Sequence, residues 1–486
     1  MSGLGMLLRP DLARSQALVG GAWIGADGGA CLAVTNPATG EVLGTVPDLG
    51  PAETARAVAA AQDAFPAWRD QTAQERAACL RRWQAALMAH GEDLARIITL
   101  EQGKPLAEAR GEVAYAASFL EWFAEEARRV YGRVIPSPWP EHQVLTLKQP
   151  LGVAALITPW NFPAAMLTRK AGAALAAGCT VVAKPASKTP LTALALAFLA
   201  QEADMPPGVL NVVTGGARAI GGELVRNPLV RKLSFTGSTE TGKALMAACA
   251  GTLKSVSLEL GGNAPFIVFD DADLDAAVAG ALASKYRNAG QTCVCANRLM
   301  AQDGIHDAFV ARLAEAVSAL RVGNGLDPEV AQGPLVDGAA VAKVEAHIQD
   351  AVAQGARVVC GGRRHELGGH FFQPTVLADV RSEMALCREE TFGPVAPVLR
   401  FTDEADAIRL ANATEYGLAA YFYARDLGRV WRVSRALEYG MVGVNAGVIS
   451  TAVAPFGGVK QSGLGREGGA EGIDAYLETK YVCMAP

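Results

Sequence analysis

Residues 153–185 read VAALITPWNFPAAMLTRKAGAALAAGCTVVAKP, and this stretch sets out the plan of the fold. Two short apolar runs, at 153–158 and 180–185, flank a helix-like stretch at 166–177. Short apolar runs that contain β-branched residues indicate strands. A strand, a helix and a second strand in this order predict a parallel sheet with helices on both faces. Such a sheet binds ligands at the carboxyl ends of its strands.

The same alternation continues to about residue 270 and then starts again. The further strand-like runs are VLNVVTG (209–215), KLSFTG (232–237) and SVSLELGG (255–262), and a further helix is predicted for Leu191–Ala203. A second α/β section begins at residue 266 and includes the strand-rich region 370–401. The chain also exceeds the roughly 250–300 residues at which a single core stops growing. We therefore predict an α/β fold with two or more domains.

The charge distribution favours a small-molecule partner. Charged residues make up 19% of the chain, and the formal net charge of −5 includes no long run of one sign. This pattern argues against a nucleic-acid binder and against a polybasic membrane anchor. The most apolar stretch, Leu191–Ala200, has about half the length of a membrane span, and the first residues lack the pattern of a signal peptide. We expect a cytoplasmic protein with no nucleic-acid or membrane partner.

The 9 cysteines are scattered and odd in number, which is typical of a reducing compartment rather than a disulfide framework. Cys293 and Cys295 stand one residue apart in NAGQTCVCANR (288–298). No histidine lies near them in the sequence, and the 6 histidines show no spacing such as HExxH. We therefore predict no metal site. The pair is either a nucleophile with a neighbour or two core thiols.

Two glycine-rich stretches look like nucleotide-binding motifs. GLGREG (463–468) fits G-x-G-x-x-G, but no strand precedes it, so we predict a flexible loop. GSTETGK (237–243) follows a strand, but Ala244 stands where a phosphate-binding loop needs Ser or Thr, so an ATPase is not expected. A helix that begins near Gly237 and Ser238 still suits a pyrophosphate. Free backbone N–H groups and the helix dipole both favour anions there.

Five stretches, taken together and in this order, strongly resemble the aldehyde dehydrogenase superfamily over nearly the whole chain. They are TPWNFP (158–163), KPASKTP (184–190), LELGGNAPFIV (258–268), GQTCVCANR (290–298) and EETFGP (389–394). Within the superfamily the sequence is most similar to the branch that oxidises succinate semialdehyde.

The resemblance implies three domains. They are a Rossmann-type cofactor domain, an α/β catalytic domain and a small β bridging domain for oligomerisation, in a homotetramer or homodimer. The implied boundaries are 1–128 with 150–260 for cofactor binding, 261–462 for catalysis, and 129–149 with 470–486 for oligomerisation. The alternating stretch 143–149 and the strand-like tail 477–484 are expected to supply the oligomerisation surface.

The same resemblance implies the catalytic residues. Cys293 matches the nucleophile, whose addition to an aldehyde gives a tetrahedral carbon that carries an oxyanion. The side-chain amide of Asn161 and the backbone N–H of Cys293 fit the oxyanion donors. Glu259 matches the general base that activates water against the thioester. A carboxyl group in an apolar stretch is expected to have a raised pKa.

The cofactor implied by the resemblance is a nicotinamide dinucleotide. Its expected binding residues are Trp160, Lys184, Ser187, Gly237, Ser238, Leu260, Glu390 and Phe392. Many relatives that prefer NAD have Glu at the position of Ser187, and a carboxylate there repels a 2′-phosphate. A hydroxyl beside Lys184 and Lys188 favours NADP instead, with NAD also possible.

The substrate implied by the resemblance is a semialdehyde with a terminal carboxylate, which is oxidised from succinate semialdehyde to succinate. Arg169 and Arg287 match the two arginines that bind this carboxylate, and Ser450 matches a third contact. Glutarate semialdehyde is an alternative substrate, because one methylene changes binding in an apolar pocket by only about 1–3 kcal/mol. A broader semialdehyde dehydrogenase that uses NAD is also an alternative.

Two other classes of protein are weighed against this prediction. A non-enzymatic member of the superfamily would be signalled by loss of Cys293 or Glu259, and both are present. A thiol-dependent acyl transferase would pass the thioester to coenzyme A, whereas Glu259 favours water. Cys295 has no step in the cycle, and we hypothesise a strained, reducible bond to Cys293 as a redox switch.

Overall fold

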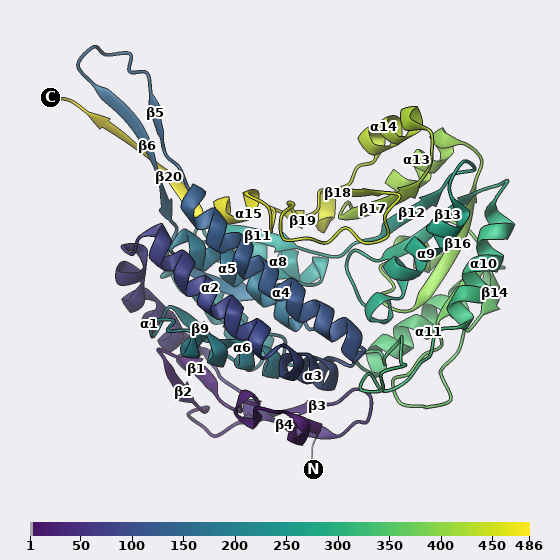
Figure 1. The fold of residues 1–486 in the computed structure, drawn as a ribbon, viewed down its shortest axis with the longest axis horizontal. Coiled ribbons are helices and arrows are strands. Elements are labelled where there is room, and N and C mark those ends of the chain that lie inside the picture. The colour runs from purple at the N-terminus through teal and green to yellow at the C-terminus, as the bar shows by residue number, and fades with distance from the viewer. Residues whose placement is uncertain (1–2) are drawn as a thin grey trace.

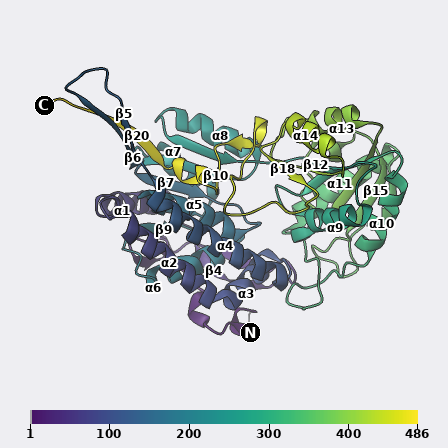
Figure 2. The ribbon, with the colours of Figure 1, turned by 45° about the horizontal axis from the view of Figure 1, so that its top comes forward.

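The computed structural model describes residues 3–486, which form two large sheets with their helices and a narrow three-stranded arm (Figure 1). The first sheet and its helices come mostly from the N-terminal half of the chain, and the second comes from residues after about 260. The two bodies remain distinct in a second orientation (Figure 2). The C-terminal segment returns to the first sheet through β19 and ends in the arm with β20.

The first sheet has eight strands in the order β19-β11-β10-β7-β8-β9-β1-β2. Its strands are β1 (Ala17–Val19), β2 (Ala22–Ile24), β7 (Val153–Ile157), β8 (Thr180–Lys184), β9 (Leu210–Val212), β10 (Val230–Thr236), β11 (Ser255–Glu259) and β19 (Gly463–Leu464). The five strands from β11 to β9 are mutually parallel, which confirms the parallel sheet predicted from the sequence. Thr236 pairs with Glu259, so both lie at the carboxyl ends of their strands.

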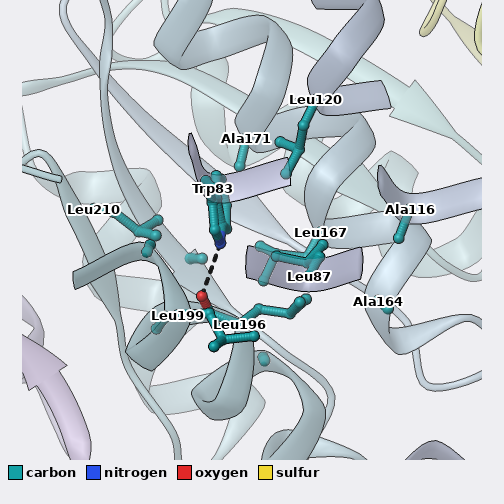
Figure 3. Packing of buried hydrophobic residues seen from close by; sticks show 14 of the residues in the cluster. Trp83, Leu87, Ala116, Leu120, Ala164, Leu167, Ala171, Leu196, Leu199 and Leu210 are labelled. Carbon is teal, nitrogen blue, oxygen red and sulfur yellow. Dashed lines mark hydrogen bonds between the residues drawn. The ribbon is translucent and has the colours of Figure 1, made fainter. Parts of the chain in front are cut away.

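Helices cover both faces of this sheet, and successive residues of its strands are therefore buried on opposite sides. Val153 of β7 packs in one apolar cluster with α1, α7 and α8, and Ala154 packs in another with α2 to α6. In the second cluster Trp83 donates a hydrogen bond of 2.9 Å to the carbonyl of Leu196 (Figure 3). The helices are α1 (Pro51–Arg69), α2 (Ala73–Ala89), α3 (Gly91–Gln102), α4 (Leu106–Glu126), α5 (Pro163–Ala177), α6 (Pro190–Glu202), α7 (Ala217–Arg226) and α8 (Thr239–Ala250).

The second sheet has seven strands in the order β14-β15-β16-β13-β12-β17-β18, and only β14 is antiparallel to its neighbour. Its strands are β12 (Ala264–Val268), β13 (Ala296–Gln302), β14 (Arg357–Cys360), β15 (Thr375–Val380), β16 (Val395–Phe401), β17 (Ala419–Tyr423) and β18 (Met441–Val444). Its helices are α9 (Leu274–Lys285), α10 (His306–Ser318), α11 (Gly338–Ala353), α12 (Ala385–Arg388), α13 (Glu404–Asn412) and α14 (Leu427–Ala436).

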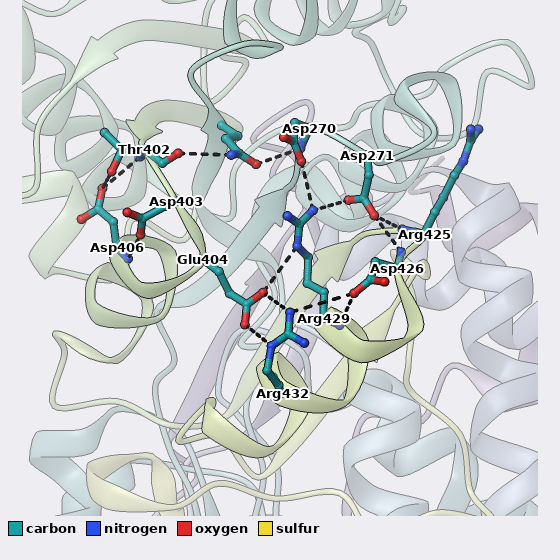
Figure 4. A network of polar contacts seen from close by, with 11 residues as sticks. Asp270, Asp271, Thr402, Asp403, Glu404, Asp406, Arg425, Asp426, Arg429 and Arg432 are labelled. Atoms are coloured by element: carbon teal, nitrogen blue, oxygen red, sulfur yellow. Dashed lines mark hydrogen bonds and ion pairs between the residues drawn. The ribbon is translucent and has the colours of Figure 1, made fainter.

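A polar network fastens two of these helices to the loop that follows β12 (Figure 4). Arg429 of α14 contacts Asp270 at 3.0 Å and Asp271 at 2.5 Å. Arg432, one turn further, pairs with Glu404 of α13 at 2.7 Å. Because several charges share this network, it holds the helix pair more firmly than an isolated exposed ion pair would.

A three-stranded antiparallel arm extends from the first body (Figure 1). It consists of β5 (Arg133–Ile135), β6 (Gln143–Pro150) and β20 (Leu477–Met484), so the predicted strand near 143–149 and the C-terminal tail pair along their length. Large apolar side chains on and near it are exposed, among them Tyr131, Val134 and Tyr481. The smaller elements are β3 (Cys31–Thr35), β4 (Val42–Pro47), α15 (Glu471–Asp474) and five short 3₁₀ turns, η1 (Gly3–Met6), η2 (Pro10–Leu12), η3 (Ala127–Arg129), η4 (Arg287–Gly290) and η5 (Lys460–Ser462).

The prediction that 463–468 is a flexible loop is wrong for Gly463 and Leu464, whereas residues 465–468 form a loop with one isolated bridge, at Glu467. Gly463 and Leu464 form β19, which pairs with Glu259 and Leu258 of β11. Gly463 has φ of +147°, and a Cβ atom there would lie 2.1 Å from the carbonyl oxygen of Leu258, so only glycine fits this approach. Glu467 is buried.

In the described part of the chain, no helix is long and apolar enough to cross a membrane.

Candidate active site

A cavity of about 290 Å³ lies where loops of the first sheet meet loops of the second. Eleven of the predicted site residues line it, namely Trp160, Asn161, Arg169, Gly237, Ser238, Leu260, Arg287, Cys293, Glu390, Phe392 and Ser450. Lys184, Ser187, Glu259 and Cys295 do not line it. The lining also includes residues that the sequence did not single out, namely Tyr115, Phe162, Met166, Thr236, Thr292, Val294, Lys343 and Phe456.

The loop before Cys293 has an unusual backbone. Asn288, Ala289 and Gly290 have φ of 51°, 55° and 73°, a run of three left-handed residues in η4. Each such non-glycine residue costs about 1–3 kcal/mol, and it persists only where surrounding contacts hold it. The strained turn places Cys293 in the wall of the cavity, three residues before β13 begins at Ala296.

Cys293 is a thiol at neutral pH in this structure. Burial raises the pKa of its side chain to about 12, and the positive charge of Arg169 opposes this shift only in part. A thiol is a weak nucleophile, so the attack on a carbonyl requires that a base remove the proton.

Asn161 lies just after β7, at the carboxyl edge of the first sheet, and its side chain is buried. Its Nδ2 donates a hydrogen bond of 3.0 Å to the carbonyl of Gln291, two residues before Cys293. That contact fixes the amide orientation and leaves the second N–H for another acceptor. Its Oδ1 is buried without a hydrogen-bond partner in the structure. The arrangement suits a donor to a developing oxyanion.

Glu259 ends β11 and is only 2% exposed. Neither carboxylate oxygen has a hydrogen-bond partner among the described residues. Burial, reinforced by the negative charge of Glu467, raises the pKa of Glu259 well above its ordinary value. The direction agrees with the expectation from the sequence, and it describes a carboxyl group that binds a proton more readily than an exposed one.

Glu467, in the stretch predicted to be a loop, contacts two neighbouring cations of α5. Its carboxylate forms an ion pair with Nε of Arg169 at 2.5 Å and another with the ammonium of Lys170. All three side chains are buried. The sequence offered no signal for Glu467, because 297 residues separate it from Lys170.

The two predicted substrate arginines differ in their surroundings. Arg169 is fully buried in the ion pair with Glu467, although its Nη1 has no hydrogen-bond partner. Arg287 forms no ion pair or side-chain hydrogen bond with any residue of 3–486, and its guanidinium lies 4.8 Å from the ring centroid of Phe162. Ser450 lines the same cavity. The cavity therefore presents unpaired donors and a free cation to an anionic group.

Six of the eight residues predicted for the cofactor end or follow strands of the first sheet at its carboxyl edge, whereas Glu390 and Phe392 precede β16 of the second sheet. Ser238 caps α8 by accepting a hydrogen bond of 3.3 Å from the backbone N–H of Thr241. Lys184 ends β8 and is 3% exposed. Its ammonium has no hydrogen bond or ion pair among residues 3–486, and burial lowers its pKa to about 8. The hydroxyl of Ser187 donates to the carbonyl of Gly215 at 3.0 Å.

Other residues complete the cofactor side of the cavity. Burial raises the pKa of Glu390 to about 7, and its Oε1 accepts a hydrogen bond of 3.1 Å from the N–H of Gly262. Trp160 meets Phe392 edge to face, with ring centroids 5.7 Å apart. Lys188, predicted as a further phosphate contact, instead pairs with a carboxylate, that of Asp337.

An unpaired buried cation and a capped helix start, both at the carboxyl edge of the first sheet, fit a phosphorylated dinucleotide. The cofactor would be held by the helix start at Ser238 and by Lys184. Within the described residues, no group of three or more His, Cys, Asp or Glu side chains is arranged to hold a metal ion.

The fold and the cavity are those of an aldehyde dehydrogenase. The model of the aldehyde dehydrogenase family matches residues 23–482, and the chain belongs to this family of oxidoreductases. It is 65% identical over 474 residues to succinate-semialdehyde dehydrogenase (NADP(+)) of Escherichia coli, with 98% of each chain covered. It is 64% identical over 473 residues to glutarate-semialdehyde dehydrogenase of Pseudomonas aeruginosa, with 97% of this chain and 98% of that protein covered.

A solved structure described as an NADP-dependent enzyme of E. coli superposes with a TM-score of 0.98. It is 64% identical in sequence, and the match covers 99% of this chain and 100% of that one. The predicted aldehyde dehydrogenase fold is therefore confirmed.

Proposed function

We propose that this protein oxidises succinate semialdehyde to succinate with NADP as the hydride acceptor. The observation that carries the proposal is the free guanidinium of Arg287 in the same cavity as the thiol of Cys293. An aldehyde that reaches Cys293 has its far end near a cation, so a terminal carboxylate is the matching group. The relative from E. coli named above carries this activity in its name.

The first half of the proposed reaction joins the aldehyde to Cys293. The sulfur adds to the carbonyl carbon as its proton leaves for a base, and the carbonyl oxygen becomes an oxyanion. The free N–H of the Asn161 amide and the backbone N–H of Cys293 stabilise that charge. A nicotinamide held at the edge of the first sheet would accept the hydride that the tetrahedral carbon loses, which leaves a thioester.

Glu259 carries the second half. Its buried carboxylate removes a proton from water, and the oxygen of that water attacks the thioester carbon and displaces the thiol of Cys293. Because Glu259 lies behind the cavity wall, its side chain must rotate toward the thioester, or one water must bridge the gap. The absence of hydrogen bonds on both carboxylate oxygens supports this freedom.

We further propose a preference for NADP. Ser187 contributes no negative charge, and the unpaired ammonium of Lys184 stands three residues before it, at the end of β8. A 2′-phosphate seeks such a cation, whereas a carboxylate at position 187 would repel it. Lys188 is engaged by Asp337, so Lys184 is the main cation of this proposed subsite.

Glutarate semialdehyde is a second candidate substrate. A relative with 64% identity is named for it, and the two substrates differ by one methylene. An apolar wall discriminates one methylene by only about 1–3 kcal/mol, so both substrates are expected to react at different rates.

Three further properties complete the proposal. The exposed apolar side chains of the arm support a homo-oligomer, either a tetramer or a dimer, built through this arm. Nine free cysteines support a reducing, cytoplasmic location. The domain boundaries expected from the sequence, with the arm as the oligomerisation domain, are part of this proposal.

The test is steady-state kinetics with succinate and glutarate semialdehydes, each with NAD and with NADP. We expect the highest kcat/KM with succinate semialdehyde and NADP, and no stimulation by coenzyme A. A Cys293→Ala variant controls for contaminating activity. If neither semialdehyde gives reduced nicotinamide with either cofactor, the proposal is wrong; a coenzyme A thioester product would favour the acyl transferase instead.

A further inference from the structure

Three charged residues outside the proposed catalytic set lie at the start of α4. Lys104, Glu108 and Glu112 are spaced four residues apart, which places the two glutamates on one face of the helix with Lys104 just before it. Lys104 and Glu112 have fully buried side chains and form an ion pair of 2.6 Å. Removing both charges from water is costly, and further hydrogen bonds must offset that cost.

The pair contacts the turn that carries Asn161. The ammonium of Lys104 donates a hydrogen bond of 2.7 Å to the main-chain carbonyl of Asn161 and lies 3.7 Å from the ring centroid of Phe162. The Oε1 atom of Glu112 accepts a hydrogen bond of 2.9 Å from the N–H of Ala164, in the first turn of α5. The two charges therefore hold the turn at Asn161 and at Ala164, without a hydrogen bond to the side-chain amide of Asn161.

Glu108 contacts the second catalytic loop. Its carboxylate accepts a hydrogen bond of 2.8 Å from the backbone N–H of Asn288, the first of the three left-handed residues. The side-chain amide of Asn288 then donates to the carbonyl of Asn161 at 3.1 Å and to that of Gln291 at 3.2 Å. The strained loop before Cys293 is thereby tied to the turn of Asn161 through α4.

We propose that Lys104 and Glu112, with Glu108, are positioning residues that align the Asn161 amide with the nucleophile loop. This inference rests on the oxyanion role proposed above for Asn161. Oxyanion donors act only when they are preorganised, so a small displacement of the turn weakens them. These three residues, called the frame, join the region of α4 to loops of both large sheets. Their side-chain hydrogen bonds go to Asn161, Ala164, Ala165, Asn288 and one another, and none goes to a proposed cofactor residue.

Two variants test the frame. Lys104→Met keeps the length of the side chain and removes the cation. Glu112→Gln removes the charge and keeps an oxygen that can accept a hydrogen bond from the N–H of Ala164. It retains more of the native contacts and therefore serves as the test variant if Lys104→Met does not fold. Arg110→Met is the matched control, because Arg110 lies on the same helix, is exposed and pairs with Glu92.

The readouts separate positioning from general damage. Loss of an oxyanion donor lowers the rate of the chemical step about 10²–10³-fold. Both variants displace the donor without removing it, so we expect the pre-steady-state burst of reduced nicotinamide to slow by about tenfold or more. Alkylation of Cys293 by iodoacetamide forms no oxyanion, so its rate is expected to stay within about twofold of wild type. The dissociation constant for NADP, measured by fluorescence titration, is expected to stay unchanged. Arg110→Met leaves all three quantities at the wild-type level.

A double-mutant cycle with Asn161→Ala decides the matter. Lys104 contacts the backbone carbonyl of Asn161, which alanine retains, so the frame itself survives this change. If Lys104 and Glu112 act through the amide, their substitution slows the burst of the Asn161→Ala variant by less than about twofold. A full additional loss in that background overturns the inference, as does an equal loss in alkylation or cofactor binding. If Asn161→Ala alone leaves the burst unchanged, the proposed oxyanion role fails first.

Discussion

The guanidinium of Arg169 and the carboxylate of Glu467 form a buried ion pair, with Nε and Oε2 2.5 Å apart. Glu467 also neutralises Lys170, so Arg169 is held in place with part of its charge already compensated. Arg287 has no such partner in the described chain. The two arginines of the proposed substrate site are therefore unequal: Arg169 offers an N–H donor held by an ion pair, and Arg287 offers a guanidinium that no ion pair engages among residues 3–486.

We predict that Arg287→Met raises the KM for succinate semialdehyde by roughly 10- to 100-fold, since a hydrogen bond to a charged group contributes about 1.5–3 kcal/mol. The KM for butanal, which has no carboxylate, is expected to change by less than about threefold, because only the carboxylate meets this charge. Steady-state kinetics with both aldehydes gives the comparison. An equal rise for butanal would mean that Arg287 shapes the cavity rather than binding the carboxylate.

We predict that Glu259→Gln keeps the burst of reduced nicotinamide but abolishes turnover. General-base catalysis contributes about 10²–10⁴-fold, so kcat is expected to fall by that range while each subunit still forms about one thioester. Rapid mixing measures the burst, and acid quenching traps the acyl-enzyme. Loss of the burst together with kcat would place Glu259 in the first half of the reaction.

The wild-type pH profile follows from the same residue. The pKa of Glu259 is raised, so its base form increases only as the pH rises through that raised value. The deacylation rate is therefore expected to rise with pH through that raised pKa, above the usual range of a carboxyl group, and this rise is expected to vanish in Glu259→Gln. Single-turnover hydrolysis of the trapped acyl-enzyme measures the rise. A rate that stays constant from pH 6 to pH 9 in the wild type contradicts the assignment.

We predict that the free enzyme is alkylated slowly at neutral pH. Burial raises the pKa of Cys293 to about 12, so the thiolate fraction grows about tenfold for each unit of pH between 7 and 9. The rate of inactivation by iodoacetamide is expected to follow with the same slope. A plateau below pH 9 would mean that the thiol is activated before any ligand binds. Cys293→Ala serves as the control for alkylation elsewhere.

The sequence allowed the local fold and the chemistry-bearing loops to be predicted, because both depend on short-range patterns. The run 153–185 contains its own strand, helix and strand, and Cys293 stands in a recognisable loop. Glu467 was missed for the opposite reason. Its partners lie almost 300 residues away, and a charge in a glycine-rich stretch is usually solvated.

Lys104 was missed in the same way. In the sequence it is an ordinary lysine in a GKP turn, and its role depends on the ion pair with Glu112 and on the carbonyl of Asn161. Tertiary contacts of this kind leave no periodic signal. The resemblance to a family gave the residues that are proposed to contact substrate, whereas the structure was needed to find the contacts of Lys104 and Glu467.

We predict that Ser187→Glu weakens NADP binding by about tenfold or more, because a carboxylate facing a 2′-phosphate places two like charges together. NAD, which lacks this phosphate, is expected to bind at least as well as in the wild type. Titration of each variant with both cofactors measures the change. Ser187→Ala is the matched control and is expected to affect NADP by less than about threefold. If Ser187→Glu leaves NADP use unchanged, the proposed 2′-phosphate subsite is wrong.

We predict that peroxide inactivates the enzyme reversibly and that Cys295 makes the recovery possible. Both thiols are free in the structure, and the Sγ of Cys295 is buried 3.4 Å from the carbonyl of Gly290 and 3.6 Å from the ammonium of Lys285. The first oxidation product of Cys293 is a sulfenic acid, which is expected to condense with the neighbouring thiol of Cys295 before it is oxidised further. A disulfide between two residues this close in sequence is strained and easily reduced.

Dithiothreitol is therefore expected to restore wild-type activity. Cys295→Ala is expected to be active before oxidation and to stay inactive after it, since its Cys293 proceeds to the sulfinic acid. Mass spectrometry of the loop peptide distinguishes the loss of two hydrogens from the gain of two oxygens. Recovery that is equal in wild type and Cys295→Ala rules out the bond.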